Sequence, residues 1–261
     1  IVSGKISATM KDTDIASLED SSFSWDDGTS GGSDDYDYHE EIVIGNTGSM
    51  QLLTTLDDED YEENVVLTND KGLEYRFVFE DALNVSQVGD SDADDLYLTL
   101  LGKQYEIEGM SATSITVVTS EEVSLSIGES VTIDGVTFTM DDVFSQDVQI
   151  NGELISDGQS KKINGKKIEV QSIGYHSNSP ELSKAIVKIG DDISKTYSDG
   201  EEYIGEDDSD PEWVWTISSL GSANGYVGVI YDWTQEDDDD DVVLAGGSYI
   251  LPENYAAVSF D

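Results

Sequence analysis

The sequence predicts an all-β protein built from antiparallel β-sandwich domains, and two observations carry this prediction. Apolar residues alternate with polar ones at a period of two, as they do in strands that bury one face. Asp-Gly and Asn-Gly pairs separate these runs every 8 to 12 residues or so, which is typical of hairpin turns. No segment carries an apolar stripe with the 3.6-residue period of a helix.

The expected strands follow one another along the chain. Residues 73–79 place Leu73, Tyr75 and Phe77 on one face, and residues 123–127 and 136–140 alternate in the same way. Towards the end of the chain, strands are expected at 213–217, 226–233 and 242–251. Turns are expected at 69–72, 134–135, 151–152, 164–165 and 199–200. The Gly/Asp/Ser-rich stretch 26–41 is interpreted as an exposed loop.

An internal repeat is visible in the middle of the chain. Residues 127–143 align with 157–173 at an offset of 30, and residues 102–110 resemble 165–173. Each copy combines a hairpin turn with an alternating strand, so the repeat is interpreted as a structural unit.

Charge also divides the chain, because seven of the 12 basic residues lie between 161 and 195. We therefore expect two sandwich domains. Residues 1–88 and 196–261 would form a discontinuous domain, and residues 89–195 an inserted domain that carries the repeat. A simple series of sandwiches is the alternative.

The net charge limits the possible partners. The chain has 57 Asp and Glu residues against 12 Lys and Arg, a formal charge of −45. Such a chain repels itself in dilute buffer, whereas the Debye length falls to about 3 Å at 1 M salt. This composition indicates a protein adapted to high salt. It excludes nucleic acid as a partner and disfavours anionic membranes.

The chain contains no cysteine and no apolar run long enough for a transmembrane segment. It begins at Ile1, and we interpret it as a processed segment of a secreted protein. The triplet at 84–86 makes Asn84 a candidate glycosylation site.

No motif favours an enzyme. Residues 28–32 match G-x-S-x-G, but the strand, helix and His partner of a nucleophile elbow are missing. His39 and His176 lack the spacing of a zinc site and are interpreted as surface residues. Carboxylate pairs are too abundant to indicate glycosidase chemistry.

The acidic loops have two interpretations. Residues 90–95 begin like a calcium loop, with the candidate ligands Asp90, Asp92, Asp94 and Asp95, but the glycine and the final glutamate of an EF-hand are absent. Ca²⁺ or Mg²⁺ is the cation expected there and at the acidic run 236–241. The competing interpretation is solvated, salt-adapted loops, with 236–241 as a hairpin tip. No cofactor is required by either interpretation.

The aromatic segment 213–233 also has two interpretations. Its Trp and Tyr residues could stack on a glycan, or they could fill a β-sandwich core. The core is favoured, because Trp213 and Trp215 share one strand face.

Three stretches, 73–84, 98–110 and 246–261, occur in an order that resembles archaeal S-layer proteins of methanococci and small-genome archaeal lineages. The matching residues are Phe79-Glu80, Leu101-Gly102-Lys103, Tyr105, Leu251-Pro252 and Asn254-Tyr255. The resemblance implies a non-enzymatic, extracellular structural protein at the cell surface, with no catalytic residues to carry over.

The leading hypothesis is therefore a protein of halophilic type that assembles with itself into an S-layer or a related surface polymer. Exposed strand edges would make the contacts, and the N-terminal segment 1–10 is a candidate donor strand. The alternatives are a cell-surface glycan- or protein-binding module and a secreted hydrolase.

Overall fold

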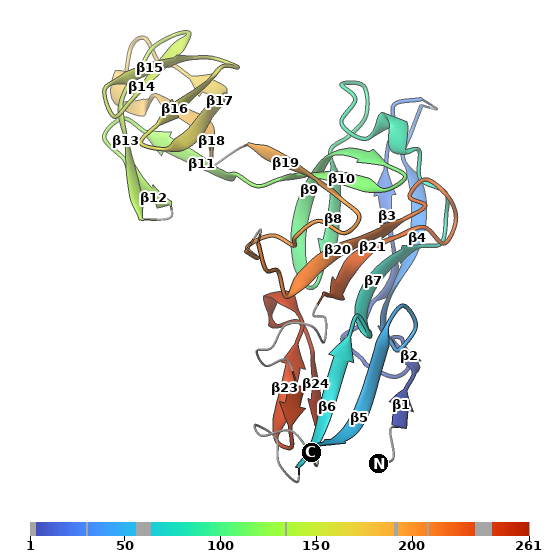
Figure 1. The fold of residues 1–261 in the computed structure, drawn as a ribbon. Coiled ribbons are helices and arrows are strands. Elements are labelled where there is room, and N and C mark those ends of the chain that lie inside the picture. Colours follow the sequence, from blue (N-terminus) through green and yellow to red (C-terminus); the bar gives the residue numbers. More distant parts are fainter. Residues whose placement is uncertain are drawn as a thin grey trace. The chain divides into compact units, whose positions relative to one another are not determined.

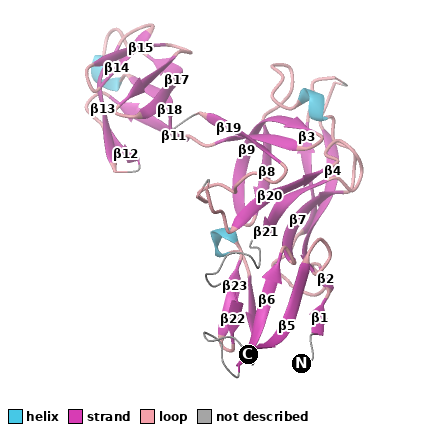
Figure 2. Cartoon of the chain, in the orientation of Figure 1, coloured by secondary structure: helices cyan, strands magenta, loops and turns pink. Residues whose placement is uncertain are grey.

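The structure, a computed structural model, describes residues 4–29, 31–55, 64–133, 135–190, 193–207, 209–232 and 242–260. The all-β prediction is confirmed: the chain is 58% strand, arranged in antiparallel sheets (Figures 1 and 2). The helices in these ranges are three short 3-10 helices of one turn each, at Val85–Gln87, Pro180–Leu182 and Pro252–Asn254.

The chain divides into two compact units. The first comprises residues 1–116 and 196–261, and the second comprises residues 117–195. We expected the inserted unit to begin at residue 89, whereas residues 89–116 belong to the first unit. The reason is that the strand at 103–111, which resembles the repeat in sequence, pairs into a sheet of the first unit.

The largest sheet belongs to the first unit. Its order is β2 (Ala8–Met10), β4 (Asp34–Ile44), β7 (Leu73–Phe79), β21 (Tyr226–Tyr231), β20 (Trp213–Ser218), and β3 (Asp20–Trp25) also pairs with β4. Main-chain groups of residues 200–203 pair with the outer edge of β20, since Trp215 N donates to Glu201 O over 2.8 Å and Tyr203 N donates to Trp213 O over 2.9 Å. This edge is therefore covered within the chain.

Three smaller sheets complete the strand pairing of this unit. The first contains β19 (Ser194–Ser198), β10 (Ser114–Val118), β9 (Lys103–Ser111) and β8 (Leu96–Leu100). The second contains β1 (Gly4–Ile6), β5 (Ser49–Thr55), β6 (Asn64–Asp70) and β22 (Val242–Leu244), and the third pairs β23 (Gly247–Ile250) with β24 (Ala257–Phe260). The chain passes into the second unit through β10 and returns through β19, which is the neighbour of β10.

Aromatic side chains fill the core beside the largest sheet. The rings of Tyr38 and Phe77 stack with their centroids 4.3 Å apart, and Trp215 packs against Tyr203 at 4.9 Å. All four side chains are buried. Aromatic pairs of this kind stabilise a core by about 0.5–1.5 kcal/mol beyond the burial of their area.

The expectation of an exposed loop over 26–41 is wrong for residues 34–41. These residues form most of β4, and Tyr36 and Tyr38 point into the core. In this strand Asp alternates with Tyr, rather than a polar residue with an aliphatic one. Because Asp is common in turns, the segment resembled a loop in sequence. His39 is correspondingly buried, with 9% of its surface exposed, whereas His176 is exposed as expected.

The second unit is formed by two four-stranded sheets around one hydrophobic core. One sheet has the order β12 (Ser130–Ile133), β13 (Val136–Val143), β14 (Asp147–Ile150), β15 (Glu153–Ser156). The other has the order β16 (Ser160–Ile163), β17 (Lys166–Gly174), β18 (Lys184–Gly190), β11 (Glu121–Ser126).

The 30-residue repeat corresponds to two equivalent hairpins in this unit, β12–β13 and β16–β17. Gly128 N donates to Met140 O, and Gly158 N donates to Val170 O at the equivalent place. The second strand of each hairpin also has a register shift directly after that acceptor residue, before Asp142 where β13 pairs with β14 and before Ser172 where β17 pairs with β18. The predicted repeat therefore has the same backbone geometry in both copies.

The two repeats also exchange a strand. The first repeat, β11–β14, contributes β11 to the sheet of the second, and the second, β15–β18, contributes β15 to the sheet of the first. Leu125 and Ile155, which are equivalent at the 30-residue offset, both enter the common core. Neither repeat has a complete sheet without the other.

This packing yields a stability prediction. Phe138 is fully buried in the core of the second unit, whereas Phe144, six residues later, is 41% exposed. We expect Phe138→Ala to lower the free energy of unfolding by about 3–5 kcal/mol, because it leaves a cavity among close-packed side chains. Phe144→Ala, the matched control, should change it by about 0.5 kcal/mol or less. Denaturant titration of the full chain at fixed salt measures both, and equal losses would contradict the packing described above.

Candidate functional site

The predicted cation ligands lie in an exposed loop that precedes β8. Asp90, Asp92, Asp94 and Asp95 are all exposed. Asp92 N donates to Asp90 Oδ1 over 3.0 Å, and Asp94 N donates to Asp26 O over 2.9 Å, so the loop is held to residue 26 by its backbone. Among the residues that the structure describes, no three Asp, Glu or His side chains gather in a way that could hold a metal ion. The cation site at 90–95 therefore stays a prediction, and the run 236–241 lies outside the described residues.

The candidate glycosylation site, Asn84, takes part in a side-chain network. Asn84 Nδ2 donates to Asp27 Oδ2 over 2.8 Å, while Thr29 donates to Asp27 Oδ1 from both its N–H and its hydroxyl. The hydrogen bond from the Thr29 hydroxyl first, that from Asn84 second and that from the Thr29 N–H third lower the pKa of the Asp27 carboxyl. Asn84 is only partly exposed, and its amide nitrogen is already a donor within the chain.

The aromatic segment that could have bound a glycan is buried in the core. Trp213, Trp215 and Tyr231 are between 1% and 4% exposed. Trp213 packs edge-on against Tyr231 with the centroids 5.3 Å apart, and Tyr231 packs in the same way against Tyr249. The core interpretation is thus confirmed for these residues, and Trp233 lies outside the described residues.

Besides Asp27, two more carboxylates are buried in the described part of the chain, Glu40 and Glu74, and no sequence motif pointed to either. Glu40 is 2% exposed and accepts hydrogen bonds from Tyr75 Oη, from Tyr255 Oη at 2.6 Å and from Glu19 N at 2.9 Å. Burial first, and the neighbouring Glu40 second, raise the pKa of the Tyr75 hydroxyl, which stays protonated as a donor.

The second buried carboxylate, Glu74, is held by the only arginine of the chain. Arg76 Nε donates to Glu74 Oε1 over 2.8 Å and Arg76 Nη2 to Glu74 Oε2 over 2.7 Å. This two-pronged pair satisfies both oxygens, and the guanidinium also lies over the ring of Tyr226 at 4.4 Å. Both buried carboxylates have protein donors on both oxygens, an arrangement typical of structural networks.

Ser30 of the G-x-S-x-G match lies outside the described residues.

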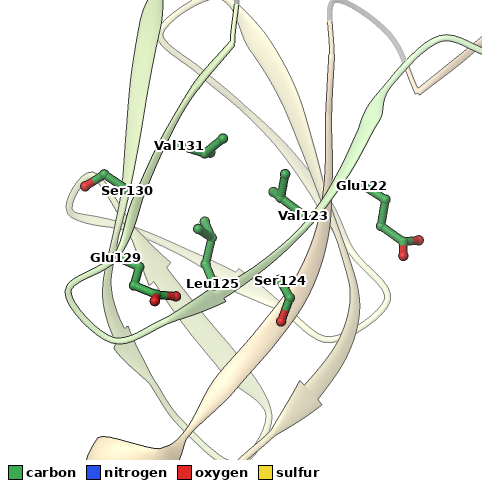
Figure 3. A pocket seen from close by; sticks show the side chains of 7 residues that line it. All are labelled: Glu122, Val123, Ser124, Leu125, Glu129, Ser130 and Val131. Atoms are coloured by element: carbon green, nitrogen blue, oxygen red, sulfur yellow. The ribbon is translucent and has the colours of Figure 1, made fainter.

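The second unit has a groove between its two sheets, at the place where β11 and β12 separate. It has a volume of about 520 Å³ and is lined by Glu122, Val123, Ser124, Leu125, Glu129, Ser130 and Val131. Figure 3 shows Val123, Leu125 and Val131 directed towards the same space, with Glu122 and Glu129 on opposite sides of it. We call this groove the acidic seam.

Local sequence explains why the seam is open. Residues 127–129 form a tight turn, closed by Glu129 N donating to Ser126 O over 3.0 Å and by Ser126 N donating to Glu129 Oε2 over 2.8 Å. The strands on either side of this turn do not pair with each other. In the described chain, β11 pairs with β18 alone and β12 with β13 alone. Each strand therefore has a free edge with unpaired main-chain groups at the seam.

The second repeat has an equivalent seam between β15 and β16, but it is closed by an ion pair. Lys161 Nζ donates to Glu153 Oε2 at 2.5 Å across this second seam. At the 30-residue offset, Lys161 corresponds to Val131 and Glu153 to Val123. Charged side chains on an edge strand, lysine above all, are a common protection against strand pairing. One seam has such a lysine, in an ion pair, and the acidic seam has neither among its lining residues.

Comparison of the chain with family models, with curated proteins and with solved structures finds no match. Within the described residues, the fold contains no helix long and apolar enough to cross a membrane.

The hydrogen bonds that Asp27 accepts from Thr29 and Asn84 predict how the stability of the fold depends on pH. A carboxyl whose pKa is lower in the folded state than its unfolded value, about 3.9, stabilises the fold above that pH, and the contribution is lost as the pH falls through the folded pKa. Thr29→Val removes the strongest donor and should raise the folded pKa. The variant should be less stable at neutral pH and should lose less stability on acidification than the unmodified chain. Thermal melts between about pH 2 and 7 measure the difference, spanning the range in which an Asp titrates. If the two proteins lost equal stability on acidification, the lowered pKa of Asp27 could not be attributed to Thr29.

Proposed function

We propose that this chain is an extracellular structural protein of halophilic type that assembles with copies of itself into a surface layer or a related polymer. The observation that carries the proposal is the acidic seam, where two free strand edges and an apolar floor have no ion pair across them like that of Lys161 and Glu153 in the second seam. Unprotected edges of this kind are natural sites for chain-to-chain contacts.

The charge of the chain supports the high-salt environment. Copies with a formal charge of −45 repel one another strongly at low ionic strength. Salt at about 1 M shortens the Debye length to about 3 Å, so that only charges almost in contact still interact. Association therefore becomes favourable only in salt or with cations between the copies.

The burial of the aromatic segment weighs against the glycan-binding alternative. Trp213 and Trp215 pack inside the first unit, and a sugar could reach them only after the core had opened. A protein-binding module is the stronger competitor, because the free edges would also accept a strand of another protein.

The N-terminal segment is a weaker candidate for the contact than the seam. Residues 4–6 pair with β5, and residues 8–10 pair with β4, within the same chain. A donor strand formed by these residues would first have to leave both sheets.

The proposal predicts salt-dependent assembly. We expect the purified chain to be monomeric in dilute buffer and to form sheets or filaments as NaCl is raised to about 3 M, where screening is nearly complete. Electron microscopy and analytical ultracentrifugation, with and without Ca²⁺, measure this. Assembly that requires Ca²⁺ even at high salt would assign specific cation sites to the acidic loops. Monomers under every condition would overturn the proposal in favour of the binding module.

A further inference from the structure

The two repeat-equivalent seams differ in charge as well as in closure. Four lysines of the second repeat stand where the first repeat has uncharged residues, and the acid Glu129 has a neutral equivalent, Gln159. The equivalent pairs are Val131 and Lys161, Thr132 and Lys162, Val136 and Lys166, and Thr137 and Lys167. The same backbone geometry thus presents acids at one seam and lysines at the other.

Two of these lysines lack partners. Lys162 of β16 and Lys167 of β17 lie directly opposite each other in register, although like charges in such a position are destabilising. Lys162 is exposed, Lys167 is partly exposed, and neither has an ion pair in the part of the chain that the structure describes. In a chain with 57 acids and 12 bases, two adjacent lysines without a carboxylate are unexpected. We call this pair, on the outer strand β16 and its neighbour β17, the basic edge.

The acidic seam has the complementary chemistry. Its floor consists of apolar side chains that the methylene groups of lysines can cover, and Glu122 and Glu129 flank that floor. A symmetric contact between two acidic seams would bring the same glutamates together, whereas a contact with a basic edge pairs opposite charges.

We propose that the acidic seam of one copy receives the basic edge of a second copy, in a head-to-tail contact. The proposal rests on the proposed self-assembly and names the surfaces that make it. The acidic seam includes β11 and the basic edge includes β16, which are the two outer strands of one sheet, so each contact leaves one surface of either kind free on every copy. Contacts between two different surfaces continue into rings or filaments, whereas a symmetric contact would stop at a dimer.

A charge-exchange experiment tests this proposal. One variant carries Glu122→Lys and Glu129→Lys, and the other carries Lys162→Glu and Lys167→Glu. Each alone presents like charges at both surfaces and should fail to assemble. In a mixture, the seam of the first variant carries lysines and can bind the glutamates at the edge of the second. The seam of the second variant keeps its glutamates and can bind the lysines at the edge of the first. Polymers in which the two variants alternate should therefore form.

The measurement is sedimentation of each variant and of their equimolar mixture at about 0.5–1 M NaCl. In this range the long-range repulsion is largely screened while charges in contact still attract. We expect at least a tenfold rise in the concentration needed for assembly for either variant alone, and recovery in the mixture. Lys162→Glu alone should raise this concentration as well, and Lys5→Glu, at an exposed lysine of β1 in the first unit, is its charge-matched control and should assemble like the unmodified chain.

A second variant tests closure of the seam without relying on a change of net charge. Val123→Glu with Val131→Lys installs the ion pair that closes the other seam. Because both valines pack against the core, the variant should unfold at a lower temperature, and it should block assembly well below that temperature. Assembly of all these variants at the concentration of the unmodified chain would overturn the head-to-tail contact but leave self-assembly intact. Failure of the unmodified chain to assemble under any salt condition would instead overturn the proposed function, and this contact with it.

Discussion

Scarcity of positive charge is the constraint on which much of this structure depends. With about one base for every five acids, the chain cannot neutralise a buried carboxylate by placing a cation beside each one. Its single arginine is used at Glu74, where the planar guanidinium satisfies both oxygens and also packs on Tyr226. At Glu40 the donors are neutral: two tyrosine hydroxyls and one main-chain N–H. Tyrosine thus serves both as core material and as a hydrogen-bond donor to buried acids.

The Glu40 network also connects distant parts of the chain. Glu40 lies on β4, Tyr75 on β7 and Tyr255 near the C-terminal strand β24, and Leu101 N donates to the Tyr75 hydroxyl from the turn between β8 and β9. With Glu19, whose N–H donates to Glu40 from the residue before β3, five segments of the first unit share one buried polar centre. Because an unpaired carboxylate in a core is costly, this centre stabilises one arrangement of the segments over the others.

The sequence predicted the strands and turns that depend on local chemistry. Period-two alternation identified β7 and β13, and the Asn-Gly pairs at 151–152 and 164–165 adopt the positive φ angles of tight turns. The strand β4 was missed, because its buried face contains Tyr36, Tyr38 and the acid Glu40 rather than aliphatic residues. The seam could not be predicted, because it depends on which sheet β11 joins, and that pairing links residue 121 to residue 189. The repeat was visible, but the exchange of strands between its copies was not.

The strand exchange sets an order of events during synthesis. Glu121 emerges from the ribosome long before Ile189, its partner in β18, so the free strand must wait for 68 further residues. At about 5–20 residues per second, that interval is about 3–14 s. During this interval β11 and the hairpins that follow it have open edges and no completed core. Open strand edges and exposed apolar residues favour association between nascent chains. Under the proposed assembly through strand edges, the chain would pass through a period in which the same contacts, made too early, join unfinished molecules.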